Sequence, residues 1–245
     1  NADLFEVTTL AGVTKITGVS GAGVYRYDTI TLTNVESVQF ADQTIALTTT
    51  QDTVTEGTKY NDDLTGTSGD DIFDPKGGDD VIDGGDGTDK ILIFENADLF
   101  EVTTLAGVTK ITGGWEAGDY RYDTILSVNN EIISFNDSEQ SLETHDRSKT
   151  VILGSYLTED LLGSEQDDIF EPWDGDDHIK GGLGTDRVLI HEKYSNFDLT
   201  KLDDNSFVLS GKYSAGSYAY NDITMVDVEE IQFLDRLETI INPKL

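Results

Sequence analysis

The chain has 245 residues, of which 48 are Asp or Glu and 16 are Lys or Arg, so its formal net charge is -32. Nucleic acid and anionic membrane surfaces would repel a protein this acidic, which excludes both as partners and favours multivalent cations. The absence of cysteine excludes disulfides and thiolate metal sites, and no apolar run approaches the length of a membrane span. The first residues, NADLFEVTTL, lack both the features of a signal peptide and an initiating Met, which suggests a fragment or a mature segment.

The chain begins with a segment that recurs twice. NADLFEVTTLAGVTKITG at 1–18 is repeated without change at 96–113, and a divergent third copy contains AGSYAYNDI (215–223) in place of AGVYRYDTI (22–30). Apolar and polar residues alternate in FEVTT, VTKIT, YRYDTITL and VESVQF of the first copy, and such alternation predicts β-strands. We therefore expect three β-rich caps of about fifty residues each.

Each cap contains two tyrosines that lie two positions apart. The pairs are Tyr25 and Tyr27, Tyr120 and Tyr122, and Tyr218 and Tyr220. Residues two apart in a strand point to the same side, so each pair is expected to share one face of a sheet. A sugar-binding aromatic platform would fit this arrangement, but cross-strand packing or capping of the neighbouring block is favoured.

Two Gly- and Asp-rich blocks, residues 53–92 and 150–189, separate the caps. In both, an acidic residue recurs every nine positions and an apolar residue follows two positions later. The acidic residues are Asp62, Asp71, Asp80 and Asp89 in the first block and Glu159, Asp168, Asp177 and Asp186 in the second. The apolar residues are Leu64, Phe73, Ile82 and Ile91, and then Leu161, Phe170, Ile179 and Val188. A disordered linker would not keep this phase, so the period predicts a repeating structure.

A coil of short strands and cation-binding loops accounts for the nine-residue period. Ca²⁺ prefers about six to eight oxygen ligands from carboxylates, main-chain carbonyls and water. Gly permits the backbone conformations that turn carbonyls toward one point, and the residues that follow form a short strand with its apolar residue inward. Because the chain reverses at each loop, loops eighteen residues apart are expected to stack on one edge. Residues 53–92 hold 11 acidic and 3 basic residues, a net charge of -8 that cations would partly neutralise.

These motifs resemble the nonapeptide G-G-x-G-x-D-x-U-x of RTX (repeats-in-toxin) calcium-binding proteins. GGDGTDKIL (84–92) and GGLGTDRVL (181–189) match every defined position, and GTSGDDIFD (66–74) lacks only the second Gly. The resemblance implies an all-β fold in which parallel β-roll blocks alternate with β-strand caps in an elongated tandem array. The expected domains are a cap at 1–52, a roll and cap at 53–147, and a second roll and cap at 148–245.

The resemblance also implies about two Ca²⁺ per block, each between two stacked loops. In the family, the earlier loop gives the carbonyls of positions 2 and 4 and its Asp, and the later loop gives the carbonyls of positions 1 and 3 and its Asp. The stronger sites would be formed by Thr67, Gly69, Asp71, Gly84, Asp86 and Asp89, and by Ser164, Gln166, Asp168, Gly181, Leu183 and Asp186. The weaker sites would be formed by Thr58, Tyr60, Asp62, Pro75, Gly77 and Asp80, and by Ser155, Leu157, Glu159, Pro172, Asp174 and Asp177.

Several positions depart from the family pattern. Proline replaces the first Gly at Pro75 and at its counterpart in the second block, and proline cannot adopt a positive φ. Tyr60, Leu157 and Gln166 replace the Gly of position 4, which puts the geometry of those loops in doubt. Glu159 is one methylene longer than Asp, so its part in binding is an open question.

The sequence favours a binding or structural role over catalysis. It contains no Ser/His/Asp set, HExxH motif, phosphate loop or dinucleotide fingerprint, and the nine-residue period accounts for the clustered carboxylates. His145, His178 and His191 have no counterparts in the sister units and are expected to be surface or packing residues. We therefore predict that the chain is not an enzyme.

Two functions fit the sequence. The first is a structural or adhesive repeat region of a large secreted protein, such as a surface adhesin or a matrix or surface-layer component. The second is the calcium-dependent C-terminal carrier of a secreted enzyme or toxin. The near-identical tandem units favour the first. The RTX resemblance implies type I secretion from a Gram-negative cell and folding outside it, with calcium, neighbouring repeats and a cell-surface or matrix ligand as the expected partners.

Overall fold

The computed structural model describes residues 1–240 apart from 11, 26, 34, 48–53 and 204. These residues form β-strands and six single-turn 3-10 helices, without an α-helix in the described part of the chain. No helix in those residues is long and apolar enough to cross a membrane. Close contacts divide the chain into two compact units: Asn1–Val102 with Ile111–Leu142, and Thr103–Lys110 with Glu143–Leu245.

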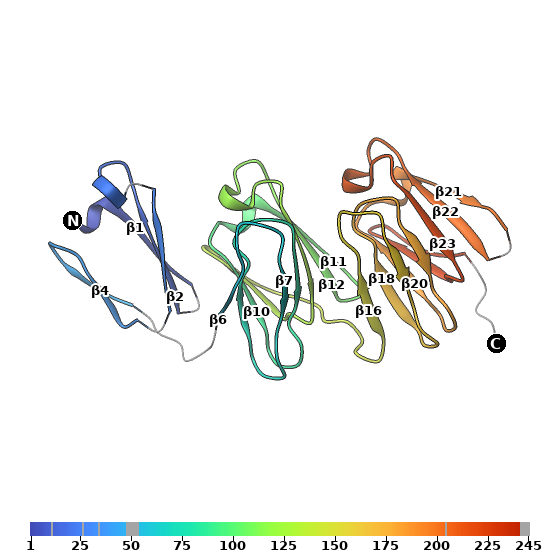
Figure 1. Cartoon of the computed structure of the whole chain (residues 1–245), viewed down its shortest axis with the longest axis horizontal. Coiled ribbons are helices and arrows are strands. Elements are labelled where there is room, and N and C mark those ends of the chain that lie inside the picture. Colours follow the sequence, from blue (N-terminus) through green and yellow to red (C-terminus); the bar gives the residue numbers. More distant parts are fainter. Residues whose placement is uncertain (11, 26, 34, 48–53, 204, 241–245) are drawn as a thin grey trace. The chain divides into compact units, whose positions relative to one another are not determined.

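The first unit contains three groups of elements (Figure 1), which we name cap 1, roll 1 and cap 2. Cap 1 consists of η1 (Ala2–Leu4), β1 (Phe5–Leu10), β2 (Val13–Gly18), η2 (Gly23–Tyr25), β3 (Thr29–Thr33), β4 (Ser37–Gln39) and β5 (Thr44–Ala46). Roll 1 consists of β6 (Val54–Glu56), β7 (Asp63–Thr65), β8 (Ile72–Asp74), β9 (Asp80–Asp83) and β10 (Lys90–Ile93). Cap 2 consists of η3 (Ala97–Leu99), β11 (Phe100–Leu105), β12 (Val108–Gly113), η4 (Gly118–Tyr120), β13 (Thr124–Val128), β14 (Ile132–Phe135) and β15 (Glu139–Ser141).

The second unit contains roll 2 and cap 3, together with the tip of the β11–β12 hairpin. Roll 2 consists of β16 (Thr150–Leu153), β17 (Asp160–Leu162), β18 (Asp168–Glu171), β19 (His178–Lys180) and β20 (Arg187–Ile190). Cap 3 consists of η5 (Tyr194–Asn196), β21 (Phe197–Lys201), β22 (Ser206–Gly211), η6 (Gly216–Tyr218), β23 (Asp222–Val226), β24 (Glu230–Phe233) and β25 (Leu237–Thr239).

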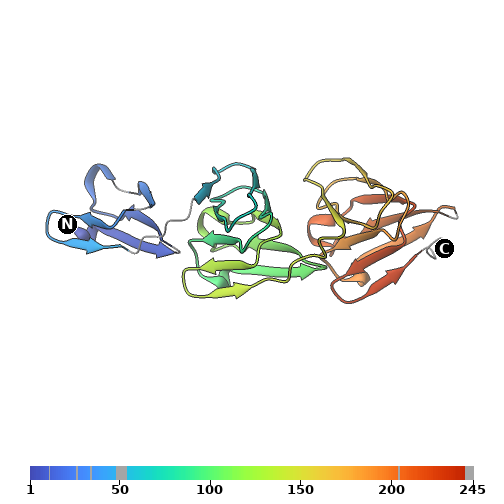
Figure 2. The same ribbon diagram turned by 90° about the horizontal axis from the view of Figure 1, so that it is seen from below.

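Each roll is a coil of parallel strands, as the sequence predicts. Alternate strands belong to opposite sheets, so β8 pairs with β10 and β7 pairs with β9, each in parallel. The register places Phe73 beside Ile91 and Leu64 beside Ile82, and both offsets are the expected eighteen residues. Roll 2 repeats this coil with β18 beside β20 and β17 beside β19 (Figures 1 and 2).

The caps extend the sheets of the rolls. Strands β13 and β14 of cap 2 add in parallel to β9 and β10, which gives two five-stranded sheets, β11-β12-β13-β9-β7 and β15-β14-β10-β8-β6. Roll 2 and cap 3 form the equivalent sheets β21-β22-β23-β19-β17 and β25-β24-β20-β18-β16. The predicted all-β class, with parallel rolls and β-strand caps alternating along the chain, is confirmed.

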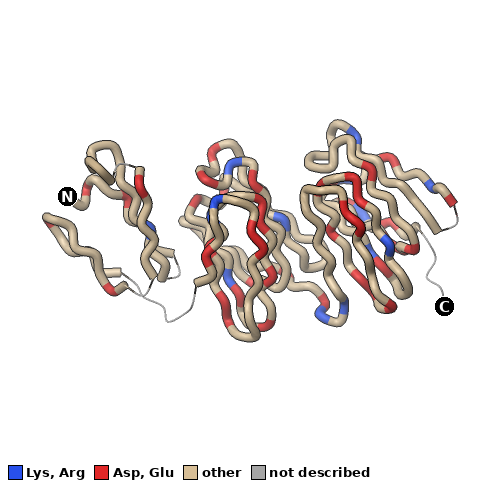
Figure 3. Tube along the Cα trace, viewed as in Figure 1, with Lys and Arg blue, Asp and Glu red and all other residues tan. Residues whose placement is uncertain are grey.

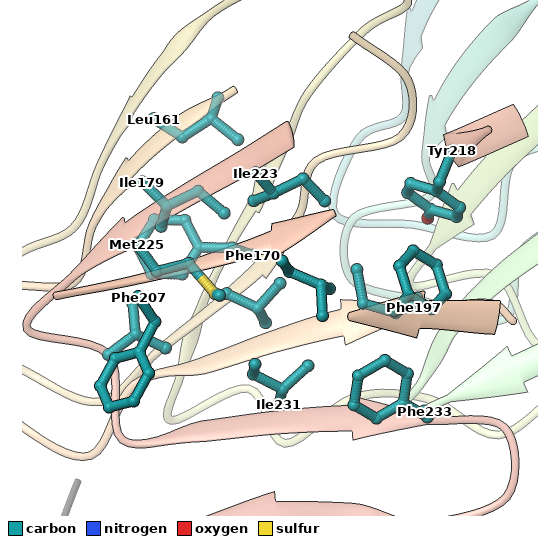
Figure 4. Packing of buried hydrophobic residues seen from close by; sticks show 14 of the residues in the cluster. Leu161, Phe170, Ile179, Phe197, Phe207, Tyr218, Ile223, Met225, Ile231 and Phe233 are labelled. Carbon is teal, nitrogen blue, oxygen red and sulfur yellow. The ribbon is translucent and has the colours of Figure 1, made fainter. Parts of the chain in front are cut away.

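The apolar residue of each nonapeptide points into a narrow core, because side chains alternate across a strand. Phe73, Ile82 and Ile91 are fully buried in roll 1. They pack with Ile125 and Ile133 of cap 2 in one cluster. The equivalent cluster of roll 2 and cap 3 contains Phe170, Ile179, Ile223, Met225 and Ile231 (Figure 4).

The tyrosine pairs do not share a sheet face, so that prediction is wrong. Tyr120 and Tyr218 lie in 3-10 turns and are buried, whereas Tyr122 and Tyr220 are 63% and 75% exposed. The reason is a tight turn in which Tyr122 and Tyr220 adopt positive φ values of 67° and 70°. The turn ends before β13 and β23 begin, so the YRYDTITL type of segment is a strand only in its second half.

The packing of the core predicts that two truncations in roll 1 destabilise the protein unequally. Phe73→Ala removes a fully buried ring and should lower the free energy of unfolding by about 3–5 kcal/mol. Leu64→Ala changes a partly exposed residue of the edge strand β7 and should lower the free energy of unfolding clearly less. Urea unfolding in the presence of calcium measures both changes. Equal losses for the two variants would contradict the inward packing of the nonapeptides.

Candidate calcium sites

The loops between the strands carry the acidic residues to the two edges of each roll. In the nonapeptide register, residues 57–62 stack against 75–80 and residues 66–71 stack against 84–89; roll 2 has equivalent loops. Figure 3 shows Asp and Glu recurring along both rolls. The predicted ligands therefore lie at the roll edges, in the loops or, for Asp80 and Asp168, at the first residue of the strand that follows the loop.

The acidic residues meet in the predicted pairs. The main-chain amide of Asp71 donates a hydrogen bond to Asp89 Oδ1 at 2.8 Å, and the amide of Asp62 donates to Asp80 Oδ1 at 2.9 Å. In roll 2 the same bonds join Asp168 to Asp186 at 2.9 Å and Glu159 to Asp177 at 3.0 Å. Four carboxylate pairs are thus brought together at an interval of eighteen residues.

The main-chain carbonyls of the predicted sites also lie where the loops stack. A Cβ atom added to Gly87 would lie 2.5 Å from the carbonyl oxygen of Gly69, and one added to Gly85 would overlap the carbonyl of Thr67. Both glycines have positive φ values, 128° and 87°, a conformation that favours Gly. In roll 2, Gly182 and Gly184 make the same close approaches to the carbonyls of Ser164 and Gln166. The carbonyls of positions 2 and 4 thus face the following loop.

The loops with unusual residues keep this arrangement. A Cβ atom at Gly57 or Gly154 would lie 2.5 Å from the carbonyl oxygen of Pro75 or Pro172, respectively. A Cβ atom at Gly78 would lie 2.7 Å from the carbonyl oxygen of Tyr60, and one at Gly175 would lie 2.5 Å from that of Leu157. Proline and bulky residues are therefore compatible with the stack, because their carbonyls take the same places.

The residues at position 3 of the later loops lie at the interface between stacked loops. The main-chain amide of each donates a hydrogen bond to the position-2 carbonyl of the loop that begins eighteen residues earlier, at 3.2–3.3 Å. The donors are Gly77, Asp86, Asp174 and Leu183. The position-2 carbonyl has a second lone pair, so this hydrogen bond does not prevent it from binding a cation.

Glu159 takes the place of the usual Asp. Its Oε2 accepts a hydrogen bond from the Ser155 amide at 2.7 Å, and its Oε1 accepts one from Ser155 Oγ at 2.7 Å. In roll 1, Asp71 accepts hydrogen bonds from the amide and Oγ1 of Thr67 on the single oxygen Oδ2, at 2.6 Å and 2.9 Å. The longer side chain is therefore accommodated in the loop.

The later carboxylate of each pair fits a bound cation. Asp80, Asp89, Asp177 and Asp186 are fully buried, and the Oδ2 atom of each accepts no hydrogen bond from the described part of the chain. A buried ionised carboxylate needs a compensating charge or hydrogen bond, since removing it from water is costly. Calcium beside these Oδ2 atoms would supply that charge.

The raised pKa values of the paired carboxylates also favour a bound cation. Burial raises the pKa of Asp80 to about 8, with a further increase from the neighbouring carboxylate of Asp62. Burial also raises the pKa of Asp177 and Asp186 to about 7 and that of Asp89 to about 6, again assisted by nearby acidic residues. Without a cation, the folded rolls therefore disfavour the ionised form of these residues.

Side chains alone do not complete a metal site in the described residues. They contain no group of three or more His, Cys, Asp or Glu side chains placed to hold one ion. Two carboxylates per stacked loop pair, supplemented by main-chain carbonyls, instead provide the all-oxygen environment that suits Ca²⁺. The geometry defines a class of protein, a parallel β-roll whose stacked loops can bind a hard divalent cation.

Comparison with known proteins identifies the repeats. The model of the RTX calcium-binding nonapeptide repeat matches residues 56–91 and 153–188, with four copies. These two segments are therefore RTX calcium-binding nonapeptide repeats. No curated protein matches the sequence. Among solved structures, the extracellular lipase LipA from Serratia marcescens is similar, with 15% identity over 77% of this chain and a TM-score of 0.22. The match covers 39% of the lipase chain.

Asp74 and Glu171 are buried acidic residues of the roll strands that the nine-residue period does not indicate. Asp74 forms an ion pair with Lys15 at 3.2 Å, and Glu171 accepts a hydrogen bond from Tyr218 Oη at 2.7 Å. Burial raises the pKa of Glu171 to about 7 and lowers the pKa of the adjacent His191 to about 3, so the histidine is neutral. His191 is a packing residue, as expected, and its Nδ1 lies 2.8 Å from Thr103 Oγ1.

The raised pKa values predict that the calcium-free fold loses stability as pH rises from about 4 to about 8. In this window folded Asp80, with a pKa of about 8 against an ordinary 3.8, keeps a proton that the unfolded chain has released. Raising the pH therefore favours the unfolded chain until the folded pKa is passed. Unfolding in chelator at several pH values measures the effect.

The double variant Asp80→Asn and Asp177→Asn is the control for this pH dependence. Its amides resemble the protonated carboxyls, so its stability should vary less with pH over the same window. A calcium-free protein whose stability rises steadily between about pH 4 and about pH 8 would contradict the assignment.

Proposed function

We propose that this chain is a calcium-binding structural or adhesive repeat region of a large secreted protein, which folds and stiffens when Ca²⁺ binds outside the cell. The observation that carries the proposal is the set of four buried carboxylates whose Oδ2 atoms lack hydrogen-bond donors in the described residues. They occur at the same place of every stacked loop pair, within segments that are RTX calcium-binding repeats. The proposal assigns no catalysis to the chain.

The proposed sites use the residues that the RTX resemblance implies, with about two ions in each roll. In the loop pair 66–71 and 84–89, the contributing groups are the carbonyls of Thr67 and Gly69 and the carboxylates of Asp71 and Asp89. Gly84 and Asp86 contribute through their carbonyls, and a Cβ atom at Gly66 would overlap the carbonyl of Gly84. The other three loop pairs provide the equivalent groups.

Calcium binding and folding are coupled in this proposal. The chain carries a formal charge of -32, and the stacked loops bring its carboxylates together in buried positions. A ligand that binds only the folded state adds its binding free energy to folding stability. A chain of this kind would stay open at the low calcium concentration of a cytosol and fold in the millimolar calcium outside the cell.

The repeat organisation favours an extended array over a carrier for an attached enzyme. Residues 1–18 and 96–113 are identical, and caps of one type follow each roll. We propose that residues 53–147 and 148–245 are successive modules, preceded by the cap of residues 1–52. Neighbouring repeats and a cell-surface or matrix ligand are the partners that such an array would contact, and type I secretion is the route that it would follow.

Calcium should convert the chain from coil to β structure. In chelator at about pH 8, where the raised pKa values no longer keep the buried loop carboxylates protonated, their mutual repulsion should leave a coil-like far-ultraviolet circular dichroism spectrum, and millimolar Ca²⁺ should restore the β signal. Magnesium at the same concentration is the control, since its smaller coordination sphere suits this carbonyl-rich site poorly. A full β spectrum in chelator at that pH would refute the coupling of folding to calcium.

Removing one carboxylate should remove one ion. Asp71→Asn keeps the shape of a side chain that belongs to a single loop pair, so the number of bound Ca²⁺ should fall by one per chain. Asp63→Asn makes the same charge change on an exposed strand residue and should leave the number unaltered. Calorimetric titration and metal analysis measure the count. An unchanged count in Asp71→Asn would show that the ligand assignment is wrong.

A further inference from the structure

Cap 2 continues the stack of roll 1 beyond its last nonapeptide. Within the roll, the amide of Gly66 donates to the carbonyl of Asp83, the residue before the next loop, at 2.8 Å. At the end of the roll, the amide of Gly84 donates in the same way to the carbonyl of Val128, at 3.0 Å. Asn129, which follows Val128, therefore takes the place of the first residue of a further loop.

Glu131 takes the place of the acidic residue in that further loop. The Asp71 amide donates to Asp89 Oδ1 at 2.8 Å, and the Asp89 amide donates to Glu131 Oε2 at 2.7 Å. The carbonyl of Asp89 in turn accepts from the amide of Ile132, the residue after Glu131, at 3.2 Å, just as the carbonyl of Asp71 accepts from Lys90. The cap loop has only three residues where a nonapeptide loop has six, and the additional methylene of Glu offsets part of that shortening.

The oxygens at the boundary are arranged as they are inside the roll. A Cβ atom at Gly66 would overlap the carbonyl of Gly84 and lie 2.9 Å from Asp71 Oδ2. A Cβ atom at Gly84 would overlap the carbonyl of Asn129 and lie 2.7 Å from Asp89 Oδ2. One carbonyl oxygen and one carboxylate oxygen thus converge at both levels. At the boundary, Asp89 Oδ2 is buried and accepts no hydrogen bond from the described residues.

Roll 2 and cap 3 repeat this boundary with a different sequence. The Gly181 amide donates to the Val226 carbonyl at 3.0 Å, and the Asp186 amide donates to Glu229 Oε2 at 2.9 Å. A Cβ atom at Gly181 would overlap the carbonyl of Asp227 and lie 2.5 Å from Asp186 Oδ2, which is also buried and unbonded in the described part of the chain. The intervening residues differ between the caps, but the glutamate and the preceding carbonyl keep their places.

We propose that each roll binds a further Ca²⁺ at its boundary with the cap that follows it, with Glu131 or Glu229 as the cap's carboxylate ligand. In roll 1 the other ligands are the Asp89 carboxylate and the carbonyl of Asn129. The carbonyls of Gly85 and Gly87 complete the set, because they occupy positions 2 and 4 of the earlier loop. A glutamate can bind Ca²⁺ through both oxygens, which raises the ligand number toward the six to eight that the ion prefers.

The boundary ion would join cap to roll. The cap strands β13 and β14 already pair with β9 and β10, and the ion would cross-link two acidic residues that otherwise repel each other. Asp186 and Glu229 are both buried, so their mutual repulsion is weakly screened by water. The sites inside the rolls would stabilise the coil, and the boundary sites would make cap docking depend on the same ion.

The test counts calcium in the whole chain after Glu131→Gln, after Glu229→Gln, and after both. Glutamine still accepts the hydrogen bond from the Asp89 or Asp186 amide, so a purely structural role would survive the change. Loss of the charge should remove one ion per altered cap, so that each altered roll falls from about three ions to about two. Asp137→Asn changes an exposed charge in cap 2 and should leave the count unaltered.

This inference rests on calcium binding by the rolls, and the outcomes separate the two proposals. If the unaltered chain binds no calcium, the proposed function fails and the boundary site fails with it. If the unaltered chain binds calcium and the double glutamine variant binds the same number with the same affinities, the boundary site alone is refuted. Loss of one further ion when Asp71→Asn is combined with Glu131→Gln supports separate sites. In each single variant, the unaltered roll reports whether the protein has folded.

Discussion

The hydrogen bond from the amide of one acidic residue to the carboxylate of the acidic residue eighteen positions later is the contact on which the rolls depend. It fixes the stacking of loops at each edge, as between Asp71 and Asp89 at 2.8 Å. It also holds two anions together in a place that water reaches poorly, because Asp89 is fully buried. The bond sets the geometry of a cation site and at the same time creates the electrostatic need for a cation.

The need for a cation in the loops is linked to the small size of the core that a roll shares with its cap. The inward residues Phe73, Ile82 and Ile91 of roll 1 belong to a buried cluster that also contains residues of cap 2. Cap 2 supplies Ile125 and Ile133 to the same cluster and extends both sheets. Burial of apolar surface and neutralisation of the loops are therefore complementary, since a small core leaves a roll with limited stability of its own.

The nonapeptides could be predicted because their contacts are set by a short, regular period. The spacing of Asp71 and Phe73 in one repeat, and of Asp89 and Ile91 two repeats later, indicates both the stacking partner and the inward side chain, and the structure contains both. The place of Glu131 could not be obtained in this way. It meets Asp89 across an interval of 42 residues, outside the nine-residue period, and only the pairing of β14 with β10 brings it to the loop edge. The recurrence of Glu36, Glu131 and Glu229 at the same place in each cap was the available signal.

The caps show most clearly what sequence determines and what tertiary structure decides. Caps 1 and 2 share an identical first segment, and both form the same hairpin, β1–β2 and β11–β12, because the alternation of apolar and polar residues is a local property. Equivalent tyrosines nevertheless differ in burial: Tyr25 is 54% exposed and Tyr120 is 3% exposed. In the described residues, the strands of cap 1 pair with no strand of a roll, whereas cap 2 covers roll 1.

The sequence by itself determined the period, the strands and the inward side chains, since these depend on neighbours along the chain. Tertiary structure decided which surfaces are covered and which carboxylates face each other across a boundary, because those contacts join segments that no period relates.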